Sequence, residues 1–199
     1  MADVSEENPQ IISDEVFEDH ILTLYAAEKA AREIREVFGD TPRAASWDSL
    51  NRLQYLDMCI KEVLRLFPIG PIILRKCTAD FRLDEKWLIP NDCGIALPIF
   101  TIHRDARYWS HPDHFHPDHF LPEAANGRHV YAYLPFSAGS RGCIGKLLAN
   151  TLIKVFICNL LQRFEIETPG TLAELQLKMD ISTRPKRGYH LKLKRRVWK

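Results

Sequence analysis

The chain has 199 residues, of which 46% are hydrophobic and 27% are charged. These proportions are ordinary for a globular protein and exclude a collagen-like or wholly disordered chain. The net charge of +1 gives no reason to expect nucleic acid as a partner. The 5 cysteines include no C-x-x-C pair, which argues against a disulfide framework and a zinc ribbon and favours a reducing compartment.

The beginning of the chain is polar and acidic. Residues 1–12 are expected to form a disordered start, and residues 13–199 are expected to form one domain. The first 20 residues contain acids but no lysine or arginine, unlike a signal peptide, which has a basic start and an apolar run. No stretch approaches the roughly 18 apolar residues of a membrane span, so we expect no transmembrane segment.

Three helices are predicted from apolar spacing and capping signals. The first begins at Ser13, a cap residue followed by two acids, and ends at Phe38 before a glycine. The second covers about Leu50–Phe67 and ends before a proline. The third, Gly145–Phe164, is apolar on nearly every side, and we therefore expect it to be buried.

Short strands and one long loop are predicted between the second and third helices. The apolar runs 72–74, 81–83 and 95–97 suit a small sheet, and the alternating residues 189–193 predict a further strand. Residues 98–136 form a proline-rich meander of a length that usually serves function in a compact domain. The expected fold class is mainly α with small β-sheets, that is, α+β.

The most specific pattern is the segment 136–145, with the sequence FSAGSRGCIG. Its glycines permit tight turns and a close approach of the backbone to a large flat group. Cys143 lies just before a predicted helix, whose N–H groups and dipole stabilise a thiolate, and Arg141 adds a positive charge nearby. Phe136 supplies an aromatic face. Together these residues predict a thiolate that binds a soft metal.

This segment matches F-x-x-G-x-R-x-C-x-G and therefore resembles the haem-binding signature of the cytochrome P450 family. The resemblance implies a truncated cytochrome P450 fold over residues 13–199, comprising its haem-binding C-terminal half, with 136–145 as the haem loop. Cys143 would then be the axial thiolate ligand of the haem iron. Arg141 would pair with a haem propionate, and Phe136, Gly139 and Gly145 would help to bind the haem.

Further motifs agree with this resemblance. Glu62 and Arg65 share one face of a predicted helix and resemble the structural E-x-x-R pair of the family. His119 stands where the family often has an arginine that joins this pair. By the same resemblance Arg75 is a second partner for a haem propionate. The resemblance also implies that Ile72 and Ile73, which shortly precede Arg75, line the substrate pocket.

The resemblance implies a haem-thiolate monooxygenase that hydroxylates an apolar small molecule with O2. An NADPH-dependent reductase would supply the electrons. The similarity is greatest to the microsomal clan of fatty-acid hydroxylases and insect detoxification enzymes, which implies the endoplasmic reticulum membrane. The chain shows no anchor, so a cytoplasmic location is the alternative, and contact with a membrane surface stays open.

One segment departs from the family pattern. After Ala27 the family continues with an acid and a threonine that help deliver protons to iron-bound oxygen, whereas Glu28–Gly39 follows here at once. The alternative interpretation is a truncated, catalytically inactive haem-binding fragment that retains no catalytic residue.

Two other patterns leave alternatives open. Imidazole suits zinc, and four histidines crowd the meander: His111, His114, His116 and His119. The basic residues 184–199 include no acid, which predicts either a solvated terminal strand or contact with an acidic partner or an anionic membrane surface.

Overall fold

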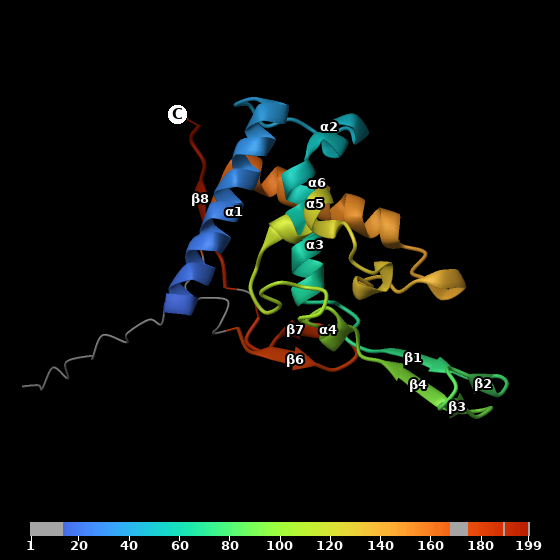
Figure 1. Ribbon diagram of the computed structural model, residues 1–199. Helices are drawn as coiled ribbons and strands as arrows, with labels where there is room; N and C mark the ends of the chain where they lie inside the picture. The colour runs from blue at the N-terminus through green and yellow to red at the C-terminus, as the bar shows by residue number, and fades with distance from the viewer. Residues whose placement is uncertain (1–13, 168–174, 189, 199) are drawn as a thin grey trace, which may run out of the picture.

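The computed structural model describes residues 14–167, 175–188 and 190–198, with side chains described from Tyr25 onward. Within these residues three long helices surround the core, and short helices and strands lie around them (Figure 1). The helices are α1 (Asp14–Phe38), α2 (Trp47–Arg52), α3 (Gln54–Leu66), α4 (Ile99–Ile102), α5 (Pro122–Ala125) and α6 (Lys146–Arg163). Three 3₁₀ turns, η1 (Pro117–Phe120), η2 (Val130–Ala132) and η3 (Gly139–Arg141), lie in the meander and the loop before α6.

The described strands form four separate antiparallel pairs. They are β1 (Ile73–Lys76) with β4 (Gly94–Leu97), β2 (Phe81–Arg82) with β3 (Leu88–Ile89), β5 (Phe164–Glu167) with β8 (Lys192–Arg195), and β6 (Leu177–Met179) with β7 (Thr183–Pro185). The expected α+β class is confirmed. The predicted three-strand sheet is instead two hairpins, because 81–82 pairs with 88–89 and leaves β1 to pair with β4 alone.

The hydrophobic core lies among α1, α3 and α6. One face of α1 follows the four-residue spacing of a helix, and Ala26, Ala30, Ile34 and Phe38 are all at most 4% exposed. Leu56, Ile60 and Leu64 of α3 and Cys158 and Leu161 of α6 complete the same cluster. The first predicted helix agrees with α1, whose apolar spacing and glycine stop are both local signals; residues 1–13 lie outside the described part.

The second predicted helix is divided, and this corrects the expectation of one helix over Leu50–Phe67. A capping box of Ser46 and Ser49 starts α2, and the helix breaks at Leu53 (φ −80, ψ 77). The start of α3 is then capped from another helix, because the Glu33 carboxylate accepts the N–H groups of Tyr55 and Leu56 at 2.7 and 2.9 Å.

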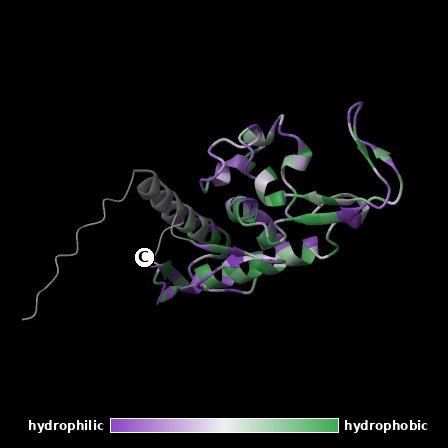
Figure 2. Cartoon of the chain, turned by 90° about the horizontal axis from the view of Figure 1, so that it is seen from below, coloured by the Kyte–Doolittle hydropathy of each residue, from purple (hydrophilic) through white to green (hydrophobic). Residues whose placement is uncertain are grey.

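The expectation that the third helix is buried on every side is wrong. Its bounds agree with α6, but only Cys158, Leu161 and Gln162 of this helix are fully buried. Leu147, Leu148, Leu152 and Phe156, here called the α6 outer stripe, are 57–68% exposed because no described element packs on that side. Figure 2 shows hydrophobic residues along much of this helix. The described helices include none that is both long and apolar enough to cross a membrane.

Candidate functional site

The loop before α6 is closed by its own backbone. The N–H of Cys143 donates to the carbonyl of Phe136 at 2.9 Å, and the N–H of Gly142 donates to Gly139 at 3.0 Å. Gly139 has a φ of +74, which favours glycine, and a Cβ on Gly142 would lie 3.2 Å from the Gly139 carbonyl oxygen. The closed turn holds Cys143 just before α6, with its side chain exposed.

Two contacts fix this loop to the rest of the molecule. Phe136 packs against the core cluster from the start of the loop. Arg75 of β1 donates to the hydroxyl oxygen of Ser137 at 3.1 Å, across 62 residues of chain. The structure therefore brings two predicted haem-binding residues to the same loop. Arg141 lies exposed on the η3 turn, and Ile72, predicted to line the substrate pocket, is 57% exposed while Ile73 is half-buried.

A fully buried ion pair lies at the end of α3. Arg65 donates to both carboxylate oxygens of Glu62, at 2.7 and 2.8 Å, and neither side chain is exposed to solvent. The remaining guanidinium hydrogens reach three backbone carbonyls of the meander, those of His103, Pro112 and His114. All five N–H donors of Arg65 are thus used, and they tie α3 to residues 38 to 49 positions away.

His119 also contacts this pair. Its Nδ1 lies 3.1 Å from Glu62 Oε1, and its Nε2 lies 2.6 Å from the Ser110 carbonyl oxygen. The N–H of His116 also donates to Glu62, at 2.8 Å. Burial alone would raise the pKa of Glu62, but the hydrogen bonds from Arg65 and His119 outweigh it and hold the pKa below its usual value.

A second histidine, to which sequence analysis assigned no role, connects the ion pair to the cysteine loop. His103 is fully buried; its Nδ1 donates to the Arg65 carbonyl at 3.1 Å, and its Nε2 accepts the N–H of Leu134 at 2.7 Å. Leu134 lies two residues before Phe136. Desolvation by burial lowers the pKa of His103 to about 4, so the ring is neutral at pH 7.

The sequence left two alternatives open, a zinc site among the meander histidines and a partner surface on the basic tail. Both find little support in the described residues. Within the described residues no group of three or more histidine, cysteine or acidic side chains is placed to hold a metal ion, and His119 is already bonded through both ring nitrogens. In the basic tail, Lys192 and Lys194 of β8 pair with Glu167, and Arg184 pairs with Asp180. Tyr189 and Lys199 lie outside the described residues, and the tail strand begins at Lys192.

Comparison with known proteins identifies the family. The cytochrome P450 family model matches residues 24–193, and the chain belongs to the cytochrome P450 family. It is 40% identical over 169 residues to cytochrome P450 4V2 of Homo sapiens, which is 85% of this chain and 32% of that protein. It is 37% identical over 169 residues to probable cytochrome P450 4p3 of Drosophila melanogaster, covering 85% and 33% of the two chains.

A solved structure has the same fold. The haem domain of cytochrome P450DA superimposes with a TM-score of 0.80 at 25% identity, over 91% of this chain and 40% of that one. The chain therefore spans about a third of the length of the curated relatives and two fifths of the solved domain. The expected family is confirmed, and both curated relatives carry the number 4 in their cytochrome P450 names.

The family implies haem, and the donor set around the loop fits one side of that group. Cys143 offers an exposed thiol, a soft donor suited to iron. Arg75 and Arg141 offer guanidinium groups suited to carboxylates. The segment after Ala27 departs from the family pattern: α1 runs unbroken through Ala27 and Glu28, and no threonine occurs between Ala27 and Thr41.

Proposed function

We propose that this chain carries the haem-thiolate site of a monooxygenase that hydroxylates an apolar small molecule. The observation that supports it most is the closed loop that presents an exposed Cys143 three residues before α6. Bound there, haem supplies the iron that activates O2, with electrons from an NADPH-dependent reductase, and thiolate donation favours cleavage of the O–O bond.

The residues of this chain would hold and orient that group. Cys143 supplies the thiolate, and its N–H, engaged with the Phe136 carbonyl, fixes the backbone from which the side chain projects. Arg75 and Arg141 pair with the propionates, with Gly139 and Gly145 keeping the loop narrow. The Glu62, Arg65 and His119 network positions the loop through His103, without touching haem. Ile72 and Ile73 contribute apolar surface to the substrate side.

A second candidate function is haem binding without turnover. It is favoured by the continuous α1, in which Glu28 directly follows Ala27 and no threonine occurs between Ala27 and Thr41. A chain of this form lacks the side chains that would carry protons toward bound oxygen, although it keeps the thiolate loop. The endoplasmic reticulum membrane surface is the proposed location of the monooxygenase, and an inactive fragment carries no such requirement.

The test is the absorption spectrum of the purified chain with haem added, reduced and then exposed to carbon monoxide. Thiolate ligation predicts the red-shifted Soret band that gives the family its name. Cys143→Ala should abolish this band, whereas Cys93→Ala, which removes a half-buried thiol of the β1–β4 hairpin, should keep it. A blue-shifted band, or no haem retained, would rule out the thiolate site.

Turnover separates the two candidates. The haem-loaded chain is supplied with NADPH, its reductase and a fatty acid, and hydroxylated product is measured against NADPH consumed. Product formation that is lost in Cys143→Ala supports the monooxygenase. Retained thiolate-ligated haem with no product supports the inactive haem-binding fragment.

A further inference from the structure

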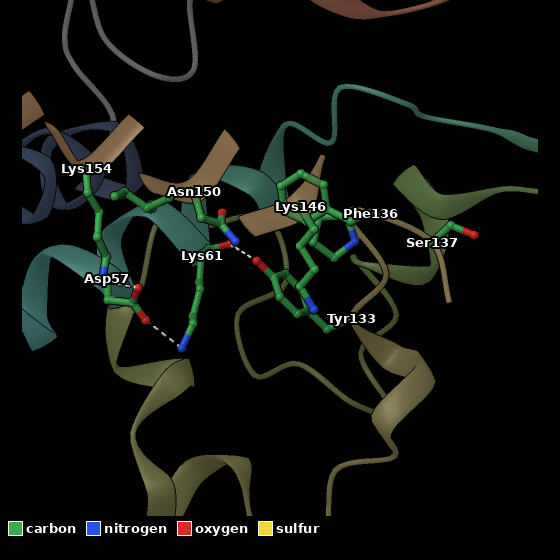
Figure 3. Close-up of a pocket in the computed structure, with 10 residues that line it drawn as sticks. Asp57, Lys61, Tyr133, Phe136, Ser137, Lys146, Asn150 and Lys154 are labelled. Carbon is green, nitrogen blue, oxygen red and sulfur yellow. Dashed lines mark hydrogen bonds and ion pairs between the residues drawn. The ribbon is translucent and has the colours of Figure 1, made fainter. Parts of the chain in front are cut away.

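A pocket of about 290 Å³ opens between α3 and α6, beside the start of the cysteine loop (Figure 3). One turn of α3 forms one wall, the segment 133–137 closes one end, and α6 forms the other wall. Lys146, Asn150 and Lys154 line it from α6 at four-residue spacing, so successive turns of that helix place one polar side chain each along the pocket.

The lining carries an excess of positive charge. Asp57 is shared by two lysines, with Lys61 at 2.7 Å from one carboxylate oxygen and Lys154 at 2.7 Å from the other. Burial would raise the pKa of Asp57, but these two ammonium groups lower it, so the carboxylate is ionised. One carboxylate cannot neutralise two lysines. Lys146 adds a third ammonium, which makes no ion pair within the part of the chain that the structure describes.

A neutral donor and apolar walls complete the pocket. Asn150 contributes an amide, whereas the Ser137 side chain points away from the lysines (Figure 3). The Tyr133 hydroxyl is engaged, because it donates to the Lys61 carbonyl at 3.0 Å. Apolar side chains cover the rest of the wall, including Ile60 and Phe136. The volume is at the lower limit of roughly 300–1,000 Å³ for small-molecule sites, which suits a small ligand.

We propose that this pocket binds the phosphate group of a small molecule. Three lysines against one aspartate leave two uncompensated positive charges, and a phosphate monoester carries about −1.5 to −2 at neutral pH. Lysine binds phosphate as a point charge, and an amide donor such as Asn150 satisfies a further phosphate oxygen. A recess between two helices favours a small anion over the flat face of an acidic protein.

The pocket adjoins the cysteine loop without needing its metal chemistry. Phe136 and Ser137 line the pocket, and the carbonyl of Phe136 accepts the N–H of Cys143. A bound phosphate would therefore contact the same short segment that orients the thiol. This site goes beyond the proposed haem-thiolate function, and its test uses the chain without added haem.

The experiment titrates inorganic phosphate into the purified chain at a constant ionic strength of about 0.1 M, with chloride exchanged for phosphate. Binding is followed by isothermal calorimetry and by amide shifts in two-dimensional NMR. We expect saturable binding with shifts confined to 57–61, 133–137 and 146–154. The Lys146→Gln variant should weaken binding by about tenfold or more.

Matched variants separate a built site from general attraction to positive charge. Lys86→Gln, on the turn between β2 and β3 outside the pocket, removes the same charge and should leave affinity within about twofold. Asn150→Asp, which keeps the side chain size but adds a negative charge, should weaken binding as strongly as Lys146→Gln. Circular dichroism serves as the check that each variant retains its helices. Lys146 is exposed, so its replacement should leave the core intact.

Three results would overturn the proposal. One is the absence of saturable binding up to roughly 10 mM phosphate in the folded chain. Another is equal weakening by Lys86→Gln and Lys146→Gln. The third is saturable binding of a glutamate-rich peptide without binding of phosphate, which would assign the pocket to a protein partner instead.

Discussion

Replacing Arg65 with lysine should be among the most damaging conservative changes in this chain. Arg65 keeps all five guanidinium hydrogens on buried acceptors: two carboxylate oxygens of Glu62 and three backbone carbonyls. Lysine keeps the positive charge but has three donors, so two of the five hydrogen bonds are lost. Glu62 Oε1 keeps its contacts with His116 and His119, so at least one buried acceptor is left unpaired. Each unpaired buried acceptor costs about 1–3 kcal/mol, so the loss is about 1–6 kcal/mol.

That loss is large on the scale of a folded domain. Whole domains are stable by about 5–15 kcal/mol, so Arg65→Lys would consume a substantial part of the free energy of unfolding. The assay is urea unfolding, followed by circular dichroism and by the fluorescence of the 4 tryptophans. One of them, Trp109, is 1% exposed, and its ring centroid lies 5.1 Å from the guanidinium carbon of Arg65. The midpoint should fall with an unchanged slope.

An exposed arginine supplies the control. Arg107 also makes a close pair, with Asp105, but 78% of its side chain is exposed, and Arg107→Lys should leave the midpoint unchanged. A Glu62→Gln variant and the double variant complete a cycle, which should show strong coupling between the two positions. The reasoning would be refuted if Arg65→Lys lost less than about 1 kcal/mol, because even one buried acceptor left unpaired costs at least that much.

Three other properties follow from burial and exposure. Lowering the pH from 6.5 toward 4 should reduce the free energy of unfolding by about 3 kcal/mol, because only the unfolded chain protonates His103 in that interval. Denaturant titrations at successive pH values should show this loss. The loss should be absent in His103→Gln. Under native conditions the exposed Cys143 should react with a thiol reagent well before Cys158, which is 0% exposed. Labelling is followed by mass spectrometry, and equal labelling rates would contradict the structure. Changing Leu148 and Phe156 to lysine should reduce binding of an apolar fluorescent dye without loss of helix content, and unchanged dye binding would show that the α6 outer stripe is covered.

Local signals predicted the elements that depend on local physics. The apolar spacing and glycine stop of α1 placed its end at Phe38, where the structure has it. The division between α2 and α3 could not be predicted, because the Glu33 carboxylate that caps α3 reaches it from another helix, 22 residues away. Likewise, the sequence of α6 shows that it is apolar on most sides, but not which of those sides another element covers.

The candidate site likewise contains some residues that are neighbours in sequence and others that only the fold brings together. The ten-residue loop pattern placed Cys143, Arg141 and Phe136 together, because the residues are neighbours in sequence. The resemblance to a family added Arg75, which the structure places on Ser137 of the loop. His103 had no such signal: it is a lone histidine in a long meander, and its role depends on two backbone groups, at Arg65 and Leu134, that only the fold brings to it.

The buried arginine also has a consequence for the order of assembly. The carbonyls that Arg65 reaches lie 38, 47 and 49 residues further along the chain, so its charge stays hydrated until the meander has closed over α3. Closure of the meander brings His103 to Leu134. The hydrogen bond between these two residues then supports the cysteine loop just before Phe136. We therefore expect the thiol to be oriented late in folding. If the chain binds haem as proposed, an incompletely closed chain would hold iron poorly, and capture of the cofactor would depend on completion of the fold.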